Sequence, residues 1–203
     1  MRLVRLIAES NPIQDLSPLR GMPLEDLRLN TTAVKDISPL ASMKLRTLNL
    51  VGANVPDLTP LSGMPLEKLR LDYCPATDFS PLRGMPLREL TVTHTSFSNG
   101  SILAGMPLSK LVADNSRLLN LSPLAGLPMK ELSLRHLVLP ISDCAPLLQM
   151  ATLQTLSITC DIKTLLPLRG HPSLKEINWM DHGFRPVADF WAEYDAQKPA
   201  GMK

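Results

Sequence analysis

The placement of proline constrains this chain more than any other sequence feature. The chain has 203 residues and 19 prolines, and most of the prolines recur in two columns that advance by 21 residues. Leucine keeps the same step, at Leu24, Leu45, Leu66, Leu87 and Leu108. Self-similarity at a fixed period of this size is typical of solenoids and other repeat architectures. The two columns are Pro18, Pro39, Pro60, Pro81, Pro123, Pro146 and Pro167, and Pro23, Pro65, Pro86, Pro107, Pro128 and Pro172.

One unit of the repeat predicts a short strand followed by a tight return. In the unit that runs from position 66 to 86, Leu69 and Leu71 alternate with Lys68 and Arg70. Alternation with period two predicts a strand with leucines facing the core and charges facing outward. We expect about nine such coils, with their strands paired in a parallel sheet.

The second half of each unit predicts a helical turn. Ser or Thr precedes Pro, as in Ser17-Pro18, which indicates an N-cap residue followed by proline at the first helical position. A glycine such as Gly21 then ends the turn. Two arms depart from the pattern: Phe97 to Ile102 lacks the Ser-Pro pair, and three extra residues fall between Arg135 and Ala151.

The unit resembles the leucine-rich-repeat family. Leu66 to Ala76 reads L-x-x-L-x-L-x-x-C-x-A, close to the family pattern, and the resemblance extends through nearly everything up to Trp179. It implies an α/β repeat solenoid of horseshoe form, with a parallel concave sheet and short 3-10 or one-turn helical convex arms. We expect this solenoid over 1–181 and a C-terminal capping helix and tail over 182–203, where Val187, Phe190, Trp191 and Tyr194 form an apolar stripe.

Charge and composition exclude several partner classes. The formal net charge is +2, from 21 basic and 19 acidic residues, which is too balanced for a nucleic-acid footprint or a membrane-binding basic patch. No segment has the roughly 18 apolar residues of a membrane span, and the first residues do not form a signal peptide. Three cysteines without paired spacing predict reduced thiols and a cytoplasmic protein.

The outward positions of the predicted strands form the candidate binding surface for a protein or peptide partner. Aromatic and ionic residues concentrate between the fourth and seventh coils, where Tyr and Arg side chains could anchor an interface. An alternative is that Lys68 through Glu131 neutralise one another as a ladder of exposed ion pairs. The predicted partner-binding residues are Lys68, Arg70, Asp72, Tyr73, Glu89, His94, Lys110, Asp114, Arg135 and His136.

Catalysis, metal binding and cofactors are not expected. His136, Cys160 and Asp181 fall in one column on successive coils, so a Cys-His-Asp arrangement is conceivable. An open sheet, however, offers no enclosed pocket that excludes water. His94 and His136 lie two coils apart, roughly 10 Å, too far to share a metal ion without further ligands. We therefore expect a non-enzymatic protein.

A second resemblance concerns the wider protein. Asp57 to Leu66 reads D-L-T-P-L-S-G-M-P-L, and this unit, with the segment from Arg185 to Asp195, is similar to C-terminal repeat regions attached to some bacterial serine/threonine protein kinases. This implies a recruiting or regulatory arm, with any kinase upstream. The first predicted strand, Leu3 to Ile7, has no cap before it, so we expect a truncated N-terminus. Self-association through that bare strand is a further alternative.

Overall fold

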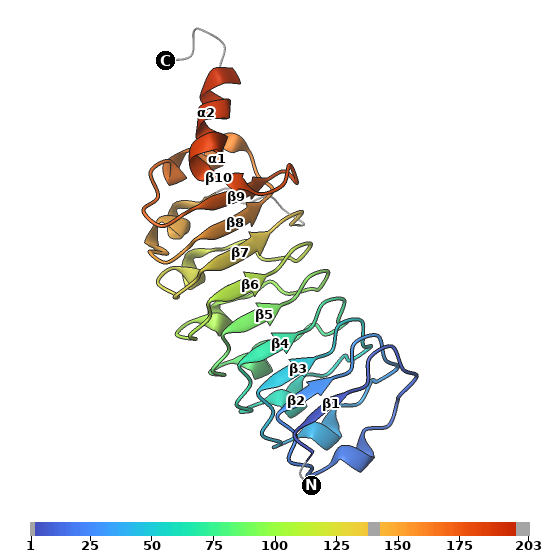
Figure 1. The fold of residues 1–203 in the computed structure, drawn as a ribbon. Coiled ribbons are helices and arrows are strands. Elements are labelled where there is room, and N and C mark those ends of the chain that lie inside the picture. Colours follow the sequence, from blue (N-terminus) through green and yellow to red (C-terminus); the bar gives the residue numbers. More distant parts are fainter. Residues whose placement is uncertain (1–2, 138–142, 198–203) are drawn as a thin grey trace.

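The chain folds into a solenoid whose strands form one continuous sheet. The computed structural model describes residues 3–137 and 143–197, and over these residues β1 to β10 lie side by side in sequence order (Figure 1). β1 to β9 are parallel, and β10 is antiparallel to β9. The predicted leucine-rich-repeat solenoid is confirmed. The strands are β1 (Arg5–Ile7), β2 (Asp26–Arg28), β3 (Thr47–Asn49), β4 (Lys68–Arg70), β5 (Glu89–Thr91), β6 (Lys110–Val112), β7 (Glu131–Leu134), β8 (Thr155–Ile158), β9 (Glu176–Trp179) and β10 (Arg185–Pro186).

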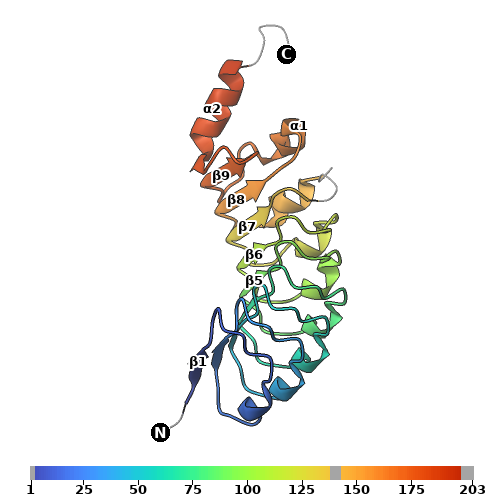
Figure 2. The ribbon, with the colours of Figure 1, turned by 90° about the vertical axis from the view of Figure 1, so that its right-hand side faces the viewer.

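The sheet lines the concave side of the stack, and the return arms form the convex side (Figure 2). Each arm contains a short 3-10 turn, and in most arms only two residues separate the proline of the turn from the glycine that follows it, which leaves no room for a longer helix. The expected short convex arms are therefore confirmed. The turns are η1 (Ser17–Leu19), η2 (Ser38–Leu40), η3 (Thr59–Leu61), η4 (Ser80–Leu82), η5 (Gly100–Leu103), η6 (Ser122–Leu124), η7 (Ala145–Gln149) and η8 (Leu166–Leu168), with one turn of α-helix, α1 (Ile162–Leu165), before η8.

A column of leucines in strict register holds the coils together. Leu48, Leu69 and Leu90 pair directly with one another on β3, β4 and β5, and none of the three exposes any surface. Burying a leucine side chain contributes roughly 1.5–3 kcal/mol. One coil alone cannot cover its own leucine, so the free energy of burial is available only when coils stack.

The residue that caps each 3-10 turn is not the one that we predicted. The turn begins at the Ser or Thr itself, and its hydroxyl caps none of the turn's backbone N–H groups. Instead, an aspartate two residues earlier accepts a hydrogen bond from that residue's backbone N–H, at 2.8 Å from Asp57 to Thr59. An Asp or Asn accepts the equivalent hydrogen bond in each of the eight described arms that contain a 3-10 turn, over distances of 2.7 to 3.1 Å. The acceptors are Asp15, Asp36, Asp57, Asp78, Asn99, Asn120, Asp143 and Asp161.

The two irregular arms differ in how much of their sequence is described. The arm without the Ser-Pro pair still forms η5, and Asn99 caps it through the backbone N–H of Ser101 at 3.1 Å. Part of the three-residue expansion, positions 138–142, lies outside the described residues. The cap therefore tolerates the loss of proline, since it depends on an acceptor and not on the ring.

A helix packs against the last coil, as expected for the C-terminal end. α2 (Val187–Gln197) buries Phe190 and Trp191, and the ring of Phe190 meets that of Trp179 on β9 with centroids 6.0 Å apart. The guanidinium of Arg169 lies 5.0 Å from the centroid of Trp191. Within residues 3–137 and 143–197, none of the helices has the length and apolar character that crossing a bilayer requires.

The leucine column makes a stability prediction within one coil. Leu111 on β6 is fully buried, whereas Leu119 in the same coil is half exposed. We expect Leu111→Ala to lower the free energy of unfolding by about 2–5 kcal/mol and Leu119→Ala to change it by about 0.5 kcal/mol or less. Urea denaturation followed by circular dichroism measures both. Equal losses in the two variants would contradict the register.

The cap makes a pH-dependent prediction. Hydrogen bonds from the hydroxyl and the backbone N–H of Thr59 hold the pKa of Asp57 below its ordinary value of 3.8. A lowered folded pKa contributes stability above the unfolded pKa, and this contribution disappears as the pH falls through the folded pKa. We expect Asp57→Ala to be less stable than the wild type at pH 7, with the difference shrinking in acid.

The amide at the same position is the matched control for the cap. Asp57→Asn should stay close to the wild type at pH 7, because Asn99 and Asn120 already serve as caps in other coils. Thermal unfolding midpoints recorded between pH 7 and pH 2.5 distinguish the two variants. A constant gap between Asp57→Ala and the wild type across this range would show that the carboxylate charge has no part in the cap.

Candidate functional site

A groove crosses the middle of the concave sheet. It lies over β3 to β6, has a volume of about 650 Å³, and we name it the central groove. Its floor is made by the outward side chains of short strands, whose inward neighbours are fixed by the leucine column. Six of the ten predicted partner-binding residues line it. Its lining residues are Arg28, Thr47, Leu48, Asn49, Val51, Lys68, Leu69, Arg70, Asp72, Tyr73, Glu89, Thr91, Thr93, Lys110 and Val112.

A second, smaller hollow follows on the same face toward the C-terminal end. It has a volume of about 300 Å³ and contains Asp114 and Arg135 from the predicted set, together with the exposed ring of Phe184. The sequence analysis missed Phe184 as a surface residue, because it falls after the repeats and we assigned that region to the cap. No periodic signal could have placed it on the concave face.

The first outward row of the sheet is an ion-pair ladder, as the alternative interpretation predicted. Lys68 Nζ lies 2.6 Å from Glu89 Oε1, and Lys110 forms an ion pair with Glu131. Arg5 and Asp26 repeat the arrangement near the start of the chain, at 3.1 Å. Exposed pairs of this kind contribute about 0–1 kcal/mol each. These side chains are therefore close to neutral as a row, although they remain accessible to a partner.

The structure places two of the predicted contact residues below the surface. The side chains of Asp72 and Asp114 are only 9% and 4% exposed. Asp72 accepts hydrogen bonds from the Thr91 hydroxyl at 2.6 Å and from the Thr93 backbone N–H at 2.9 Å. Asp114 accepts equivalent bonds from Ser133 and Arg135 on the next coil. These carboxylates brace neighbouring coils, and the hydroxyl residue 19 positions later is the sequence signal that could have revealed them.

The two arginines of the predicted set differ in how far they are engaged. Arg135 donates to Asp114 Oδ2 from Nε and Nη2 at 2.9 and 2.7 Å, and from Nη1 to Asp181 at 3.0 Å. The bonds to Asp114 raise the pKa of Arg135 above its usual value, against the opposing effect of burial. Arg70 is 58% exposed, and its Nε lies 3.9 Å from Asp72. Arg70 thus offers a largely free guanidinium to the central groove.

Two aromatic rings stack at the edge where the strands end. The centroids of Tyr73 and His94 are 4.7 Å apart with an interplanar angle of 12°, and Tyr73 is 60% exposed. Both residues have a positive φ, 63° and 54°. We name the positions that turn here in successive coils the turn row. The described members with positive φ are Ser10, Thr31, Gly52, Tyr73, His94, Asn115, His136 and Asp181.

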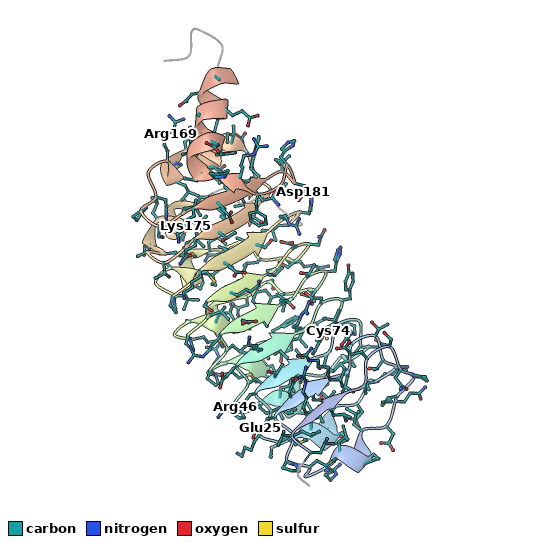
Figure 3. All side chains as sticks on the ribbon, viewed as in Figure 1. Glu25, Arg46, Cys74, Arg169, Lys175 and Asp181 are labelled. Atoms are coloured by element: carbon teal, nitrogen blue, oxygen red, sulfur yellow. The ribbon has the colours of Figure 1, made fainter. Side chains whose placement is uncertain are left out.

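His136 and Asp181 meet directly at the same edge. Figure 3 labels Asp181 on the turn that follows β9. The Nε2 of His136 lies 2.5 Å from Asp181 Oδ2. Loss of hydration raises the pKa of Asp181, but hydrogen bonds from His136 and Arg135 outweigh it and lower that pKa. The pair joins the seventh coil to the turn after β9, so His136 is bound within the protein.

The conceivable Cys-His-Asp arrangement is not assembled. Cys160 is buried and its thiol hydrogen-bonds with that of Cys144 in the core, whereas His136 and Asp181 lie on the surface. That thiol contact lowers the pKa of Cys160, against the effect of burial, and raises that of Cys144. Across the described part of the chain, no three His, Cys, Asp or Glu side chains gather closely enough to hold a metal ion.

The turn row makes a prediction about backbone strain at Tyr73. Residues other than glycine at positive φ are strained, and glycine already occupies this position in the third coil, at Gly52. Tyr73→Gly and Tyr73→Ala both remove the ring, but only glycine adopts the turn without strain. We expect the glycine variant to be more stable than the alanine variant by about 1 kcal/mol in urea denaturation. Equal stability would mean that the turn is not strained.

Comparison with solved structures supports the fold through sequence identity as well as structural similarity. No family model matches the sequence, and no curated protein matches it significantly. Internalin C2 from Listeria monocytogenes is similar in its crystal structure, with 33% sequence identity and a TM-score of 0.71 over 74% of this chain and 69% of that chain. Internalin F from the same organism aligns over 88% of this chain and 69% of that chain, at 22% identity and a TM-score of 0.47. The chain belongs to the leucine-rich-repeat family of which internalin C2 is a member.

Proposed function

We propose that this protein is a non-enzymatic interaction module that binds a protein partner on its concave sheet, centred on the central groove. The observation that carries the proposal is the exposed Tyr73–His94 stack beside the accessible Arg70. Aromatic and arginine side chains dominate the energetics of protein interfaces. The likeness to internalin C2 supports a protein-interaction module in general.

The geometry of the groove favours binding over catalysis. It is an open hollow on a sheet, and its charged side chains engage one another or face solvent. A catalytic site gains much of its effect from excluding water around preorganised groups. The central groove instead presents a broad surface with a few anchor side chains, which is the usual form of a protein-binding face.

The alternatives from the sequence stay predictions. A recruiting arm attached to a kinase would use the same concave surface, and it rests on the resemblance of the repeats alone. Self-association would involve β1 and the two residues before it, where Ile7, Leu3 and Val4 are exposed. The cytoplasmic location likewise stays a prediction.

Affinity capture with matched variants tests the concave face. The concave variant carries Arg70→Glu and Tyr73→Ala. The control carries Arg83→Glu, an exposed arginine at the end of η4 in the same coil. Purified wild type and both variants, each shown by circular dichroism to be folded, are used to capture proteins from a lysate of the source cell. We expect a partner that wild type and control retain and the concave variant loses, with affinity at least about 10-fold lower in titration of the purified partner.

Retention by all three proteins would contradict the proposal and move the binding surface elsewhere. Loss in both variants would have the same consequence, since it would reflect charge and not position. A partner lost only from the Arg83→Glu variant would place binding on the convex arms.

A further inference from the structure

We infer that the central groove recognises an acidic, extended segment of its protein partner that carries an aromatic residue. A carboxylate of the segment pairs with Arg70, and a flat side chain packs on the Tyr73–His94 stack. This inference rests on the proposed function and specifies the chemistry of the partner. It follows from two features of the groove and its edge: the loosely paired guanidinium of Arg70, and the exposed rings that stack at positions of strained backbone.

Each cation of the central groove has a carboxylate partner, but the pairs differ in how close they are. The lining of the groove contains four cations, Arg28, Lys68, Arg70 and Lys110, and two anions, Asp72 and Glu89, so it has an excess of two positive charges. The neutralising carboxylates of two of these cations, Asp26 and Glu131, lie at the borders of the groove. Lys68 is paired inside it with Glu89. Arg70 has the longest of these contacts, 3.9 Å to Asp72, and is therefore the most loosely paired cation of the groove.

Arg70 is arranged to accept a carboxylate from outside. Its closest acidic oxygen, Asp72 Oδ2, lies 3.9 Å from Nε, beyond hydrogen-bond distance, and already accepts the Thr91 hydroxyl at 2.6 Å. Arg135 shows the opposite state, with two bonds to one carboxylate oxygen and a third to another residue. A guanidinium forms its strongest contacts as a planar fork to a carboxylate. The fork of Arg70 is available for such a contact.

The stacked rings occupy positions where the fold itself does not call for them. In the turn row, the neighbouring coils place Ser10, Thr31, Gly52 and Asn115, which are small or well suited to a positive φ. A tyrosine at φ 63° is strained, and its ring is mostly exposed, so its presence contributes little to the core. Residues in strained backbone conformations cluster at functional sites. The exposed face of Tyr73 offers a flat surface beside the charged groove.

A protein segment fits this surface better than a nucleic acid. Binding of double-stranded DNA typically neutralises several phosphates at once, and one free guanidinium cannot supply that. The four strands beneath the groove span roughly 14 Å at the usual sheet spacing, a distance that four or five extended residues cover.

Selection from a random peptide library tests the inference. A phage library of random 12-residue peptides is selected on the wild-type protein, with counter-selection on the double variant that carries both Arg70→Gln and Tyr73→Ala. We expect the enriched sequences to have a net negative charge and at least one aromatic residue. A synthetic consensus peptide should bind the wild type at least about 10-fold more tightly than Arg70→Gln or Tyr73→Ala in fluorescence anisotropy, whereas Arg83→Gln should match the wild type.

Variants of the peptide separate the two contacts. Replacing its Glu and Asp by the amides should weaken binding to the wild type and have little further effect on Arg70→Gln. Replacing its aromatic residue by Ala should likewise weaken binding to the wild type and have little further effect on binding to the Tyr73→Ala variant. Absence of enrichment, enrichment of neutral or basic peptides, or binding that Arg70→Gln leaves unchanged would overturn the inference. A labelled oligo-uridine that binds more tightly than the peptide, in an Arg70-dependent manner, would also overturn it.

The affinity capture tests the binding face, and the peptide selection tests the acidic specificity, so either experiment can fail without the other. A partner lost from the concave variant, combined with peptides that are not acidic, would leave the proposed binding face in place and remove only the acidic specificity. A partner retained by the concave variant would remove the binding face itself, whatever peptides the library yields.

Discussion

The structure depends on the burial of one leucine per coil against the leucine of the next. A strand of three residues with a single inward side chain has no stability of its own, and a return arm of one 3-10 turn cannot cover it. Stacking in register solves both problems, because Leu48, Leu69 and Leu90 pair directly and each covers the next. Every polar feature of the molecule has to fit the 21-residue period that this contact imposes.

Two sets of polar side chains, repeated from coil to coil, accept hydrogen bonds from backbone N–H groups, which leucine side chains cannot do. On the arms, an aspartate or asparagine accepts the backbone N–H at the start of each turn. On the sheet side, Asp72 and Asp114 accept a hydroxyl and a backbone N–H from the following coil. Buried carboxylates are costly unless fully hydrogen-bonded, so both are fixed in place by their partners. They give the groove a rigid floor and leave the exposed rows free to vary.

The 21-residue period made the fold predictable from the sequence. Departures from strict alternation limited how much of the candidate site could be predicted. The leucine and proline columns were sufficient for the parallel sheet and the 3-10 arms. The cap was assigned to the wrong residue, because Ser-Pro is a common helix start and the acceptor lies two residues earlier. Asp72 and Asp114 face the concave side as alternation predicts, but alternation could not show that both side chains are hydrogen-bonded to the next coil. Arg135 and His136 both bond to Asp181, about 45 positions away, and no local pattern announces such a contact.

The turn row shows why a repeat protein can specialise without disturbing its fold. Each coil must turn at the same place, and small residues or Asn make that turn at least cost. A large ring at this position adds strain but lies outside the leucine column, so the stacking of coils is unaffected. Tyr73 and His94 occupy adjacent coils, and the register brings the centroids of their rings to 4.7 Å while both residues stay exposed. Side chains in the turn row can therefore change while the leucines keep the solenoid intact, and the strain at Tyr73 is the cost of placing a large exposed ring there.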